Sequence, residues 1–455
     1  MLVHNAASPQ AAAAALAQQS RDFQVKLSHL AIVAAVALAL HGCGGTSGAD
    51  QGGLRLVNAS ADFAALDLYN GSGRIAGGVA ANSASAFLGL DKASYTLNLK
   101  EAGAGTTLAS ASVSVDKGQN YSVVAYSSGG ALKTTTITES APAPASGAAK
   151  FRVFNTASVE AGTLDVYLSG AACSALSGSA TPVAAGVSGL QSTFTEIGAA
   201  GGAGTAYHVC VTGAGDKADL RLDLPAATLV DQQVVTLILM KSSGGVLVHG
   251  LLHVQGAAVS AALNIAARVR LAADAASAAN VSASLNSVSL GSAVVSPAVG
   301  TYRLVPAGAL TGVIGIGATP LADPTFSASA GADYTLLVAG SAGAPTLRLL
   351  VDDNTPSPSS TAPVKLRFVN GLNGVAGGVT LTLDNSIVAD SIAFGSASSP
   401  VQVAASSALA NLAATLGAST YFSATAQTLS ANRVYSVFLL GDAAGTPRGL
   451  LRVDR

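Results

Sequence analysis

The residues that could carry catalytic or metal chemistry are few in this sequence. It has three cysteines and six histidines. It has no GxSxG elbow, no GxGxxG or GxxxxGK phosphate loop, and no CxxC pair. These absences predict a protein that is not an enzyme and that holds no cofactor and no metal ion.

Three short patterns come close to a site but have simpler explanations. Ser114 and Lys117 match SxxK, but that chemistry needs a helical turn, and this segment reads as a strand end. His249 and His253 lie in an expected strand, where four residues span roughly 13 Å, too far to share one metal ion. They are expected to be surface or lining residues. The run 352–354, Asp-Asp-Asn, is expected to be a solvated strand end with turn-forming residues.

The N-terminal segment predicts export. Residues 27–40, LSHLAIVAAVALAL, follow Arg21 and Lys26, which gives the charged flank and short apolar core of a secretory signal. The apolar run is too short to span a bilayer, which needs about 20 residues. A buried core helix is the alternative.

Cys43 ends a motif that resembles the bacterial lipobox. Leu40, Gly42 and Cys43 match that motif, and His41 stands where a small residue is usual. The resemblance implies that Cys43 is lipidated, and the alternative is an ordinary cleavage site followed by an incidental cysteine. Gly44 follows in place of the Asp that marks inner-membrane retention, so the resemblance implies an outer-membrane lipoprotein facing the periplasm or the surface.

Cys173 and Cys210 remain if Cys43 is acylated. Both fall in one repeat, and an exported protein meets oxidising conditions, so a disulfide between them is expected. It would close a loop of about 37 residues and contribute about 3–4 kcal/mol in the chain-entropy model. Two separate buried thiols are the alternative.

Composition indicates either a small-side-chain β protein or low complexity, and periodicity has to decide between them. Half of the residues are hydrophobic, only 10% are charged, and the formal net charge is −1. No basic patch indicates a nucleic-acid partner.

Four segments repeat the same order of strands. Each opens with an alternating strand that contains an arginine and ends with a hairpin of two apolar strands; the openings are Leu54–Asn58, Phe151–Asn155, Val269–Leu271 and Leu366–Asn370. Ser-Ser-Gly-Gly turns at 127–130 and 242–245 suit hairpins. The predicted fold is all-β: four tandem Ig-like antiparallel β-sandwich units after an N-terminal signal and lipoprotein segment. Residues 406–416 are left open as a short helix or a strand pair.

The repeats predict the domain boundaries. They are a signal peptide at 1–42, the lipidated Cys43 with a flexible tether at 43–53, sandwich units at 54–139, 150–255, 264–353 and 364–455, and Pro-rich linkers at 140–149 and 354–363. The break at 256–263 is weaker, which leaves open a packing of the second unit on the third. Laid end to end, four units of roughly 40 Å would reach on the order of 150 Å.

The first unit resembles a known bacterial family. Residues 54–60 (LRLVNAS), 66–69 (LDLY), 94–97 (SYTL) and 118–124 (GQNYSVV) are similar to the family catalogued as domain of unknown function 4397. The resemblance covers the second and fourth units in part and the third in outline. It implies secreted or surface-anchored Ig-like units with no established catalytic residues.

These observations predict a non-enzymatic, lipid-anchored envelope or cell-surface protein built for structural or adhesion-type display. The alternative is a lipoprotein that binds a polysaccharide or a peptide with the loops at the sandwich ends. Recurrent tyrosines at 121, 334 and 435 are expected to be structural, each with its hydroxyl bonded to nearby backbone; a carbohydrate platform is the alternative. The expected partners are the membrane, through the lipid, and an envelope polysaccharide or protein.

Overall fold

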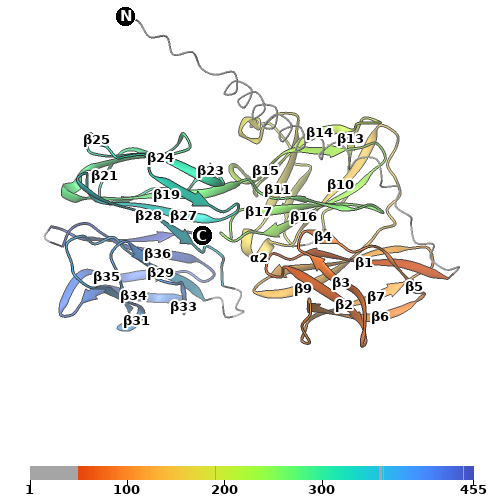
Figure 1. Cartoon of the computed structure of the whole chain (residues 1–455), viewed down its shortest axis with the longest axis horizontal. Coiled ribbons are helices and arrows are strands. Elements are labelled where there is room, and N and C mark those ends of the chain that lie inside the picture. The colour runs from red at the N-terminus through yellow and green to blue at the C-terminus, as the bar shows by residue number, and fades with distance from the viewer. Residues whose placement is uncertain (1–49, 190, 358–360, 362, 444) are drawn as a thin grey trace, which may run out of the picture. The chain divides into compact units, whose positions relative to one another are not determined.

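The computed structural model describes residues 50–455 except 190, 358–360, 362 and 444. Residues 49–455 form one compact unit. This part consists of eight β-sheets, two from each of four successive segments (Figure 1). The predicted class, all-β with four tandem β-sandwiches, is confirmed.

The first sandwich, drawn in red to orange in Figure 1, has two sheets. One sheet contains β4 (Ser83–Ala84), β1 (Gln51–Ala59), β8 (Asn120–Ser128) and β9 (Ala131–Thr138), with β5 (Leu88–Asp91) also paired to β1. The other contains β3 (Gly73–Ala80), β2 (Ala65–Asn70), β6 (Ala93–Glu101) and β7 (Thr107–Val115).

The second sandwich repeats this plan and adds an edge strand. One sheet contains β13 (Thr195–Gly198), β10 (Ala148–Asn155), β16 (Val234–Lys241), β17 (Val248–Val254) and β18 (Val259–Ala262). The other contains β12 (Ala184–Val187), β11 (Leu164–Ser169), β14 (Thr205–Gly213) and β15 (Asp216–Leu229). Two short helical turns lie in its loops, α2 (Ser158–Ala161) and the 3₁₀ turn η1 (Cys173–Ala175).

The third sandwich has short strands on both sheets. One sheet contains β22 (Ala298–Val299), β19 (Ala266–Ala275), β27 (Asp333–Ser341) and β28 (Ala344–Asp352), with β23 (Arg303–Pro306) on β19. The other contains β21 (Val288–Val295), β20 (Asn280–Leu285), β24 (Gly308–Ile316) and β25 (Thr319–Pro320), with β26 (Thr325–Ala328) on β24. The 3₁₀ turn η2 (Ala276–Ala278) connects β19 to β20.

The fourth sandwich closes the described chain. One sheet contains β32 (Ser396–Ala397), β29 (Val364–Asn370), β36 (Val434–Leu440) and β37 (Arg448–Val453), with β33 (Val401–Val403) on β29. The other contains β31 (Ser386–Ile392), β30 (Val379–Leu383), β34 (Ser406–Leu416) and β35 (Ser419–Leu429). Residues 406–416, left open between a helix and a strand pair, form the single strand β34.

Each sandwich contains one parallel pair, which the sequence pattern did not predict. The first strand pairs in parallel with the penultimate strand, and the last strand is antiparallel to that partner. Leu54, Tyr121 and Thr138 therefore lie in one row across β1, β8 and β9. The equivalent rows of the other sandwiches are Phe151–Val235–Val254, Val269–Tyr334–Val351 and Leu366–Tyr435–Val453. The chain thus enters and leaves the first, third and fourth sandwiches at the same end, whereas β18 of the second sandwich runs back along β17 and ends beside Gly250.

The strand that opens the first sandwich begins earlier than predicted. Gln51, Gly52 and Gly53 were assigned to the flexible tether, but they belong to β1. A Cβ at Gly52 would lie 2.5 Å from the backbone oxygen of Asp116, and one at Gly53 would lie 2.2 Å from Asn120 Oδ1. These glycines permit close packing of the backbone, a role that composition alone cannot distinguish from flexibility.

Alternation along the strands builds a separate core in each sandwich. Leu54 and Leu56 of β1 face Leu66 and Leu68 of β2 inside the first sandwich, and all four are at most 1% exposed. The alternate residues of β1, such as Val57, point the other way and are also buried. A sheet buried on both faces needs a second layer against its outer side.

That second layer is the next sandwich in the chain. Val57 and Val124 of the first sandwich pack against Phe154, Ile238 and further apolar residues of the second. The third and fourth sandwiches meet in the same way, through a cluster of Ala272, Val299, Leu337, Ala339, Val369, Phe438 and Leu440. The two sandwiches of each pair therefore lie side by side, although a Pro-rich segment joins them. Since the chain enters and leaves a sandwich at one end, the next sandwich is placed beside it.

Candidate functional site

An arginine of the first strand lies opposite a hydroxyl residue in every sandwich. The pairs are Arg55–Ser122, Arg152–Thr236, Arg270–Thr335 and Arg367–Ser436. In each, the arginine Nε donates to the hydroxyl oxygen, over distances of 2.7, 2.9, 2.9 and 3.3 Å respectively. These side chains point away from the core of their own sandwich, so they lie where a neighbouring sheet packs.

The first junction joins Arg55 to a carboxylate and an imidazole. Arg55 Nη2 lies 2.9 Å from Glu139 Oε1 and 3.1 Å from His253 Nε2, which belongs to the second sandwich. Arg55 Nη1 also donates to the backbone oxygen of Ala257, and the Gly256 N–H donates to Glu139 Oε2 over 2.6 Å. The network is buried, since the Glu139 side chain is 0% exposed. A buried charge needs this number of partners to avoid a large desolvation penalty.

The surroundings of Glu139 hold it ionised. Burial alone would raise the pKa of its carboxyl group. The hydrogen bond and charge of His253, the charge of Arg55 and the Gly256 N–H outweigh burial and lower the pKa to about 2. Glu139 is therefore an anion throughout the neutral range.

The second junction exchanges arginines between the third and fourth sandwiches. Arg367 Nη2 donates to Asp352 Oδ1 of the third sandwich over 2.6 Å, and Arg270 pairs with Asp454 of the fourth. Ser436 Oγ donates to Asp454 over 2.5 Å, and Thr335 Oγ1 donates to Asp352 over 2.6 Å. Each sandwich thus supplies a cation to the other's anion.

Asp352 and Asn354 were expected at a solvated strand end, and this prediction is wrong. Both are 1% exposed. Asn354 Nδ2 donates to Asp333 Oδ2 over 2.7 Å and to the Tyr302 hydroxyl over 3.0 Å. The end of β28 is covered by the fourth sandwich, which local sequence does not reveal.

A cavity of about 550 Å³ is lined by loop and strand residues of all four sandwiches. Its hydroxyl and amide side chains are Ser60, Asn82, Ser242, Ser243, Thr355, Ser357 and Gln402, and apolar atoms contribute the rest of its surface together with the charged residues. Its two lysines are paired: Lys241 Nζ lies 2.8 Å from Asp62, and Lys365 Nζ lies 2.6 Å from Asp353. No Phe or Tyr side chain belongs to the part of the lining that the structure describes.

Glu160 is the unusual residue of this cavity. It is 1% exposed and belongs to the short turn α2. Its Oε1 accepts the Gly129 N–H over 2.8 Å, whereas its Oε2 has no hydrogen-bond partner. Ser357 Oγ, also in the lining, is likewise buried without a partner. A buried carboxylate oxygen without a donor is costly, and a ligand in the cavity could supply one.

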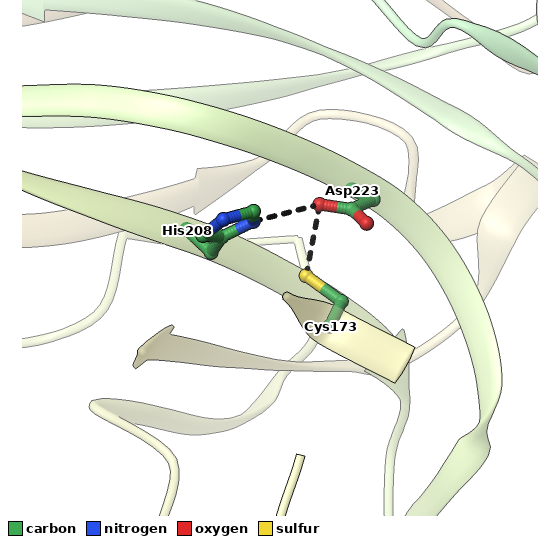
Figure 2. Close-up of side chains that lie close together, drawn as sticks. All are labelled: Cys173, His208 and Asp223. Carbon is green, nitrogen blue, oxygen red and sulfur yellow. Dashed lines mark hydrogen bonds and ion pairs between the residues drawn. The ribbon is translucent and has the colours of Figure 1, made fainter. Parts of the chain in front are cut away.

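The second sandwich contains a cluster of sulfur, imidazole and carboxylate groups (Figure 2). Cys173 of η1 is joined by a disulfide bond to Cys210 of β14, with an S–S distance of 2.07 Å. Asp223 Oδ1 lies 3.1 Å from Cys173 Sγ and 3.4 Å from His208 Nδ1. His208 and Asp223 were not predicted to lie beside this disulfide. His208 and Cys210 are two residues apart on one strand and so share a face, which is the signal that could have indicated the group.

The remaining candidates have structural roles. Ser114 is the penultimate residue of β7, and Lys117 pairs with Asp50 over 3.1 Å, so they form no catalytic pair. His249 lines the cavity and accepts the Asn264 N–H at Nδ1 over 3.0 Å. Cys43, the predicted lipidation site, lies outside the described residues.

The recurrent tyrosines are structural, as expected. The hydroxyls of Tyr121, Tyr334 and Tyr435 accept backbone N–H groups five residues upstream, from Asp116, Ser329 and Ser430, over 3.2, 2.9 and 3.0 Å. In the second sandwich Val235 takes this place. The positions of these three tyrosines therefore do not support the alternative that they bind carbohydrate.

Within the described residues, no helix is long and apolar enough to cross a bilayer. The fold and the buried junctions define the class: a protein of paired, tandem β-sandwiches. Residues 52–167, which comprise the first sandwich and the opening strands of the second, match the family described as Domain of unknown function (DUF4397). The resemblance to that family is thereby confirmed for this stretch.

No curated protein matches the chain. Among solved structures it is similar to CBMbc (family CBM26) from Eubacterium rectale Amy13K in complex with maltoheptaose, at 13% identity over 46% of this chain and 97% of that one, with a TM-score of 0.15. It is also similar to the Bacillus anthracis TIE protein, at 11% identity over 82% of this chain and 66% of that one, with a TM-score of 0.13. At these scores neither likeness carries an argument about this chain.

Proposed function

We propose that this chain is a non-enzymatic, lipid-anchored envelope protein whose paired β-sandwiches form a stiff display scaffold. The observation that carries the proposal is the buried charged junction within each pair, at Arg55–Glu139–His253 and at Arg270–Asp454 with Arg367–Asp352. Such junctions fix one sandwich against the next, because sliding would leave buried charges unpaired. A signal-like run and the lipobox-like motif before Cys43 support the anchor.

Membrane fractionation tests the anchor. Wild-type protein is expected in the membrane fraction, and Cys43→Ala in the soluble exported fraction. A Cys173→Ala, Cys210→Ala double variant is the control, and it should stay with the membrane. Release of both variants, or of neither, would contradict lipidation at Cys43.

The cavity favours a second function, the binding of an envelope polysaccharide. Loops at the sandwich ends form it, its hydroxyl and amide lining suits a ligand rich in hydroxyl groups, and Glu160 Oε2 lacks a donor. A sugar hydroxyl placed against this oxygen would supply that donor.

A glycan array followed by titration tests this binding. Glu160→Gln keeps an oxygen for the Gly129 N–H but replaces the unpartnered oxygen with a donor, so affinity for any array hit should fall about tenfold or more. Glu196→Gln removes a carboxylate from an exposed position of the same sandwich and should change nothing. Saturable binding on a peptide array, without a hit on the glycan array, would show that the ligand is a peptide and not a polysaccharide. If neither array gives a hit, the ligand-binding function is refuted and only the display function remains.

A further inference from the structure

The Cys173 cluster is assembled by three elements of the second sandwich. His208 and Cys210 project from the same face of β14, and Asp223 lies opposite Cys210 on β15. Cys173 reaches them from η1, in the connection between β11 and β12. One ligand atom from each of Cys173, His208 and Asp223 lies within 4.8 Å of the others (Figure 2).

The disulfide prevents this cluster from holding a metal ion. A thiolate is the form of cysteine that ligates, and Cys173 Sγ is already bonded to Cys210 Sγ. The same sulfur has no proton, so its 3.1 Å approach to Asp223 Oδ1 is a contact without an S–H donor. In the oxidised protein only an imidazole nitrogen and a carboxylate oxygen remain as ligands.

Reduction supplies the two missing ligands. Two thiol molecules reduce the bond by exchange: the first forms a mixed disulfide with one cysteine and frees the other, and the second releases the mixed disulfide as an external disulfide. The protein then has two thiols, and binding a divalent cation releases their two protons. Two thiolates, an imidazole and a carboxylate make up a four-ligand set that suits tetrahedral zinc.

We propose that reduction of the Cys173–Cys210 bond converts this cluster into a binding site for a thiophilic divalent cation, with Zn²⁺ as the probe. The site is built for such a change. Cys210 is 0% exposed on a paired strand, while Cys173 belongs to a three-residue turn in a connecting loop. Two sulfurs on one zinc ion stand about 3.8 Å apart at Zn–S distances of about 2.3 Å, so the turn has to shift by less than about 2 Å.

Access and charge also suit a cation. The side chains of His208 and Asp223 are 25% and 35% exposed, which leaves a path from solvent to the buried sulfurs. Two thiolates and one carboxylate give a charge of −3 around the ion. Oxidation and metal binding exclude each other at this site, so the metal would also shield the thiols from oxidation.

Zinc titration of the full chain, carrying Cys43→Ser so that only two thiols remain, tests the proposal. After reduction with a phosphine, one Zn²⁺ should bind per chain, at least about 100-fold more tightly than to the oxidised protein. Co²⁺ in place of Zn²⁺ should give the thiolate charge-transfer absorption of a cysteine-ligated site.

Substitutions of His208 and Asp223 distinguish a four-ligand site from binding by the two thiols alone. His208→Ala and Asp223→Ala leave the disulfide intact and should each weaken Zn²⁺ binding to the reduced chain at least about tenfold. Asp216→Ala changes an exposed carboxylate of the same sandwich away from the cluster and should leave Zn²⁺ binding unaltered. A reduced chain that keeps its circular dichroism but binds Zn²⁺ no better than the oxidised one would overturn the proposal. So would Zn²⁺ binding that survives the His208→Ala, Asp223→Ala double substitution unchanged.

Discussion

Arg270 shows how much a single side chain contributes at the residue scale. Its guanidinium carbon lies 4.6 Å from the centre of the Tyr302 ring and 4.9 Å from that of Phe438, and its nitrogens pair with Asp352 and Asp454. Two carboxylates from different sandwiches therefore share this cation, and Asp352 also pairs with Arg367. Arginine suits this place because its planar group stacks and donates at once.

Arg270→Ala is expected to lower the free energy of unfolding of the third and fourth sandwiches by about 3–5 kcal/mol, because two buried carboxylates lose a partner. Urea unfolding measures the loss, and limited proteolysis should show earlier cleavage between the two sandwiches. Arg303→Ala, at an exposed position of the same sandwich, is the control and should change stability by less than about 0.5 kcal/mol. Equal effects of the two substitutions would refute the role given to Arg270.

Asp274 is the opposite case, a buried carboxyl without a cation. Burial raises its pKa to about 8; the Gly441 N–H acts against this rise and the charge of Asp442 adds to it. Its Oδ2 has no hydrogen-bond partner. The folded protein thus retains a proton that the unfolded chain loses near pH 4, so stability falls as pH rises from about 4 to about 8.

Asp274→Asn should remove this fall in folding stability with rising pH. The variant is expected to be more stable than wild type by about 5 kcal/mol at pH 8 and equal to it near pH 4. Urea midpoints at the two pH values give the comparison. A gain of the same size at both pH values would show that the carboxyl is not neutral in the folded state.

At the scale of the element, the tyrosine that opens the penultimate strand ties that strand to the preceding turn. Tyr334→Phe leaves the Ser329 N–H without its acceptor and should cost about 1 kcal/mol. Tyr95→Phe removes an exposed hydroxyl that donates to the Asp91 oxygen over 2.9 Å and should cost less than half as much. Thermal unfolding of the two variants measures the stability that each loses. A larger loss for Tyr95→Phe than for Tyr334→Phe would contradict the structural role given to the Tyr334 hydroxyl.

Elements were predictable where the signal is local. Alternation in 54–58 and the Gly turns at 129–130 and 244–245 indicate strands and hairpins, and these are present. The parallel pairing of β1 with β8 was not predictable, because its partners stand more than 60 residues apart and no turn joins them. The segment Val234–Lys241, VVTLILMK, is apolar on both faces and could have indicated a sheet covered on both sides.

The candidate site was less predictable than the fold. Glu160, Asp62 and Lys365 come from separate sandwiches and meet only because the sandwiches pack together. Nothing in the residues around Glu160 distinguishes it from an exposed carboxylate. His208 could have been predicted, because it lies two residues from Cys210 and alternate residues of a strand share a face.

At the scale of the whole molecule, the junction at Glu139 makes the first pair of sandwiches sensitive to acid. The pKa of this carboxyl is lowered from 4.5 to about 2 in the folded protein. The stabilisation, about 3 kcal/mol, is therefore complete above about pH 4.5 and is lost as pH falls towards 2.

Glu139→Gln should abolish that part of the acid response and lower stability at neutral pH. Thermal midpoints of the variant and wild type, measured from pH 7 down to pH 2, should converge at the acid end. Glu196→Gln, which changes an exposed carboxylate of the neighbouring sandwich, should follow the wild-type curve. Parallel curves for wild type and Glu139→Gln would contradict the assignment.

The row that joins Leu54, Tyr121 and Thr138 has a mechanical consequence. A force applied at the two chain ends of a sandwich acts on one end of its sheet, where the first and last strands flank the penultimate one. The hydrogen bonds of this ladder then break one after another rather than all together. Under load, the first, third and fourth sandwiches are each expected to peel open at low force, so the chain would lengthen gradually under tension.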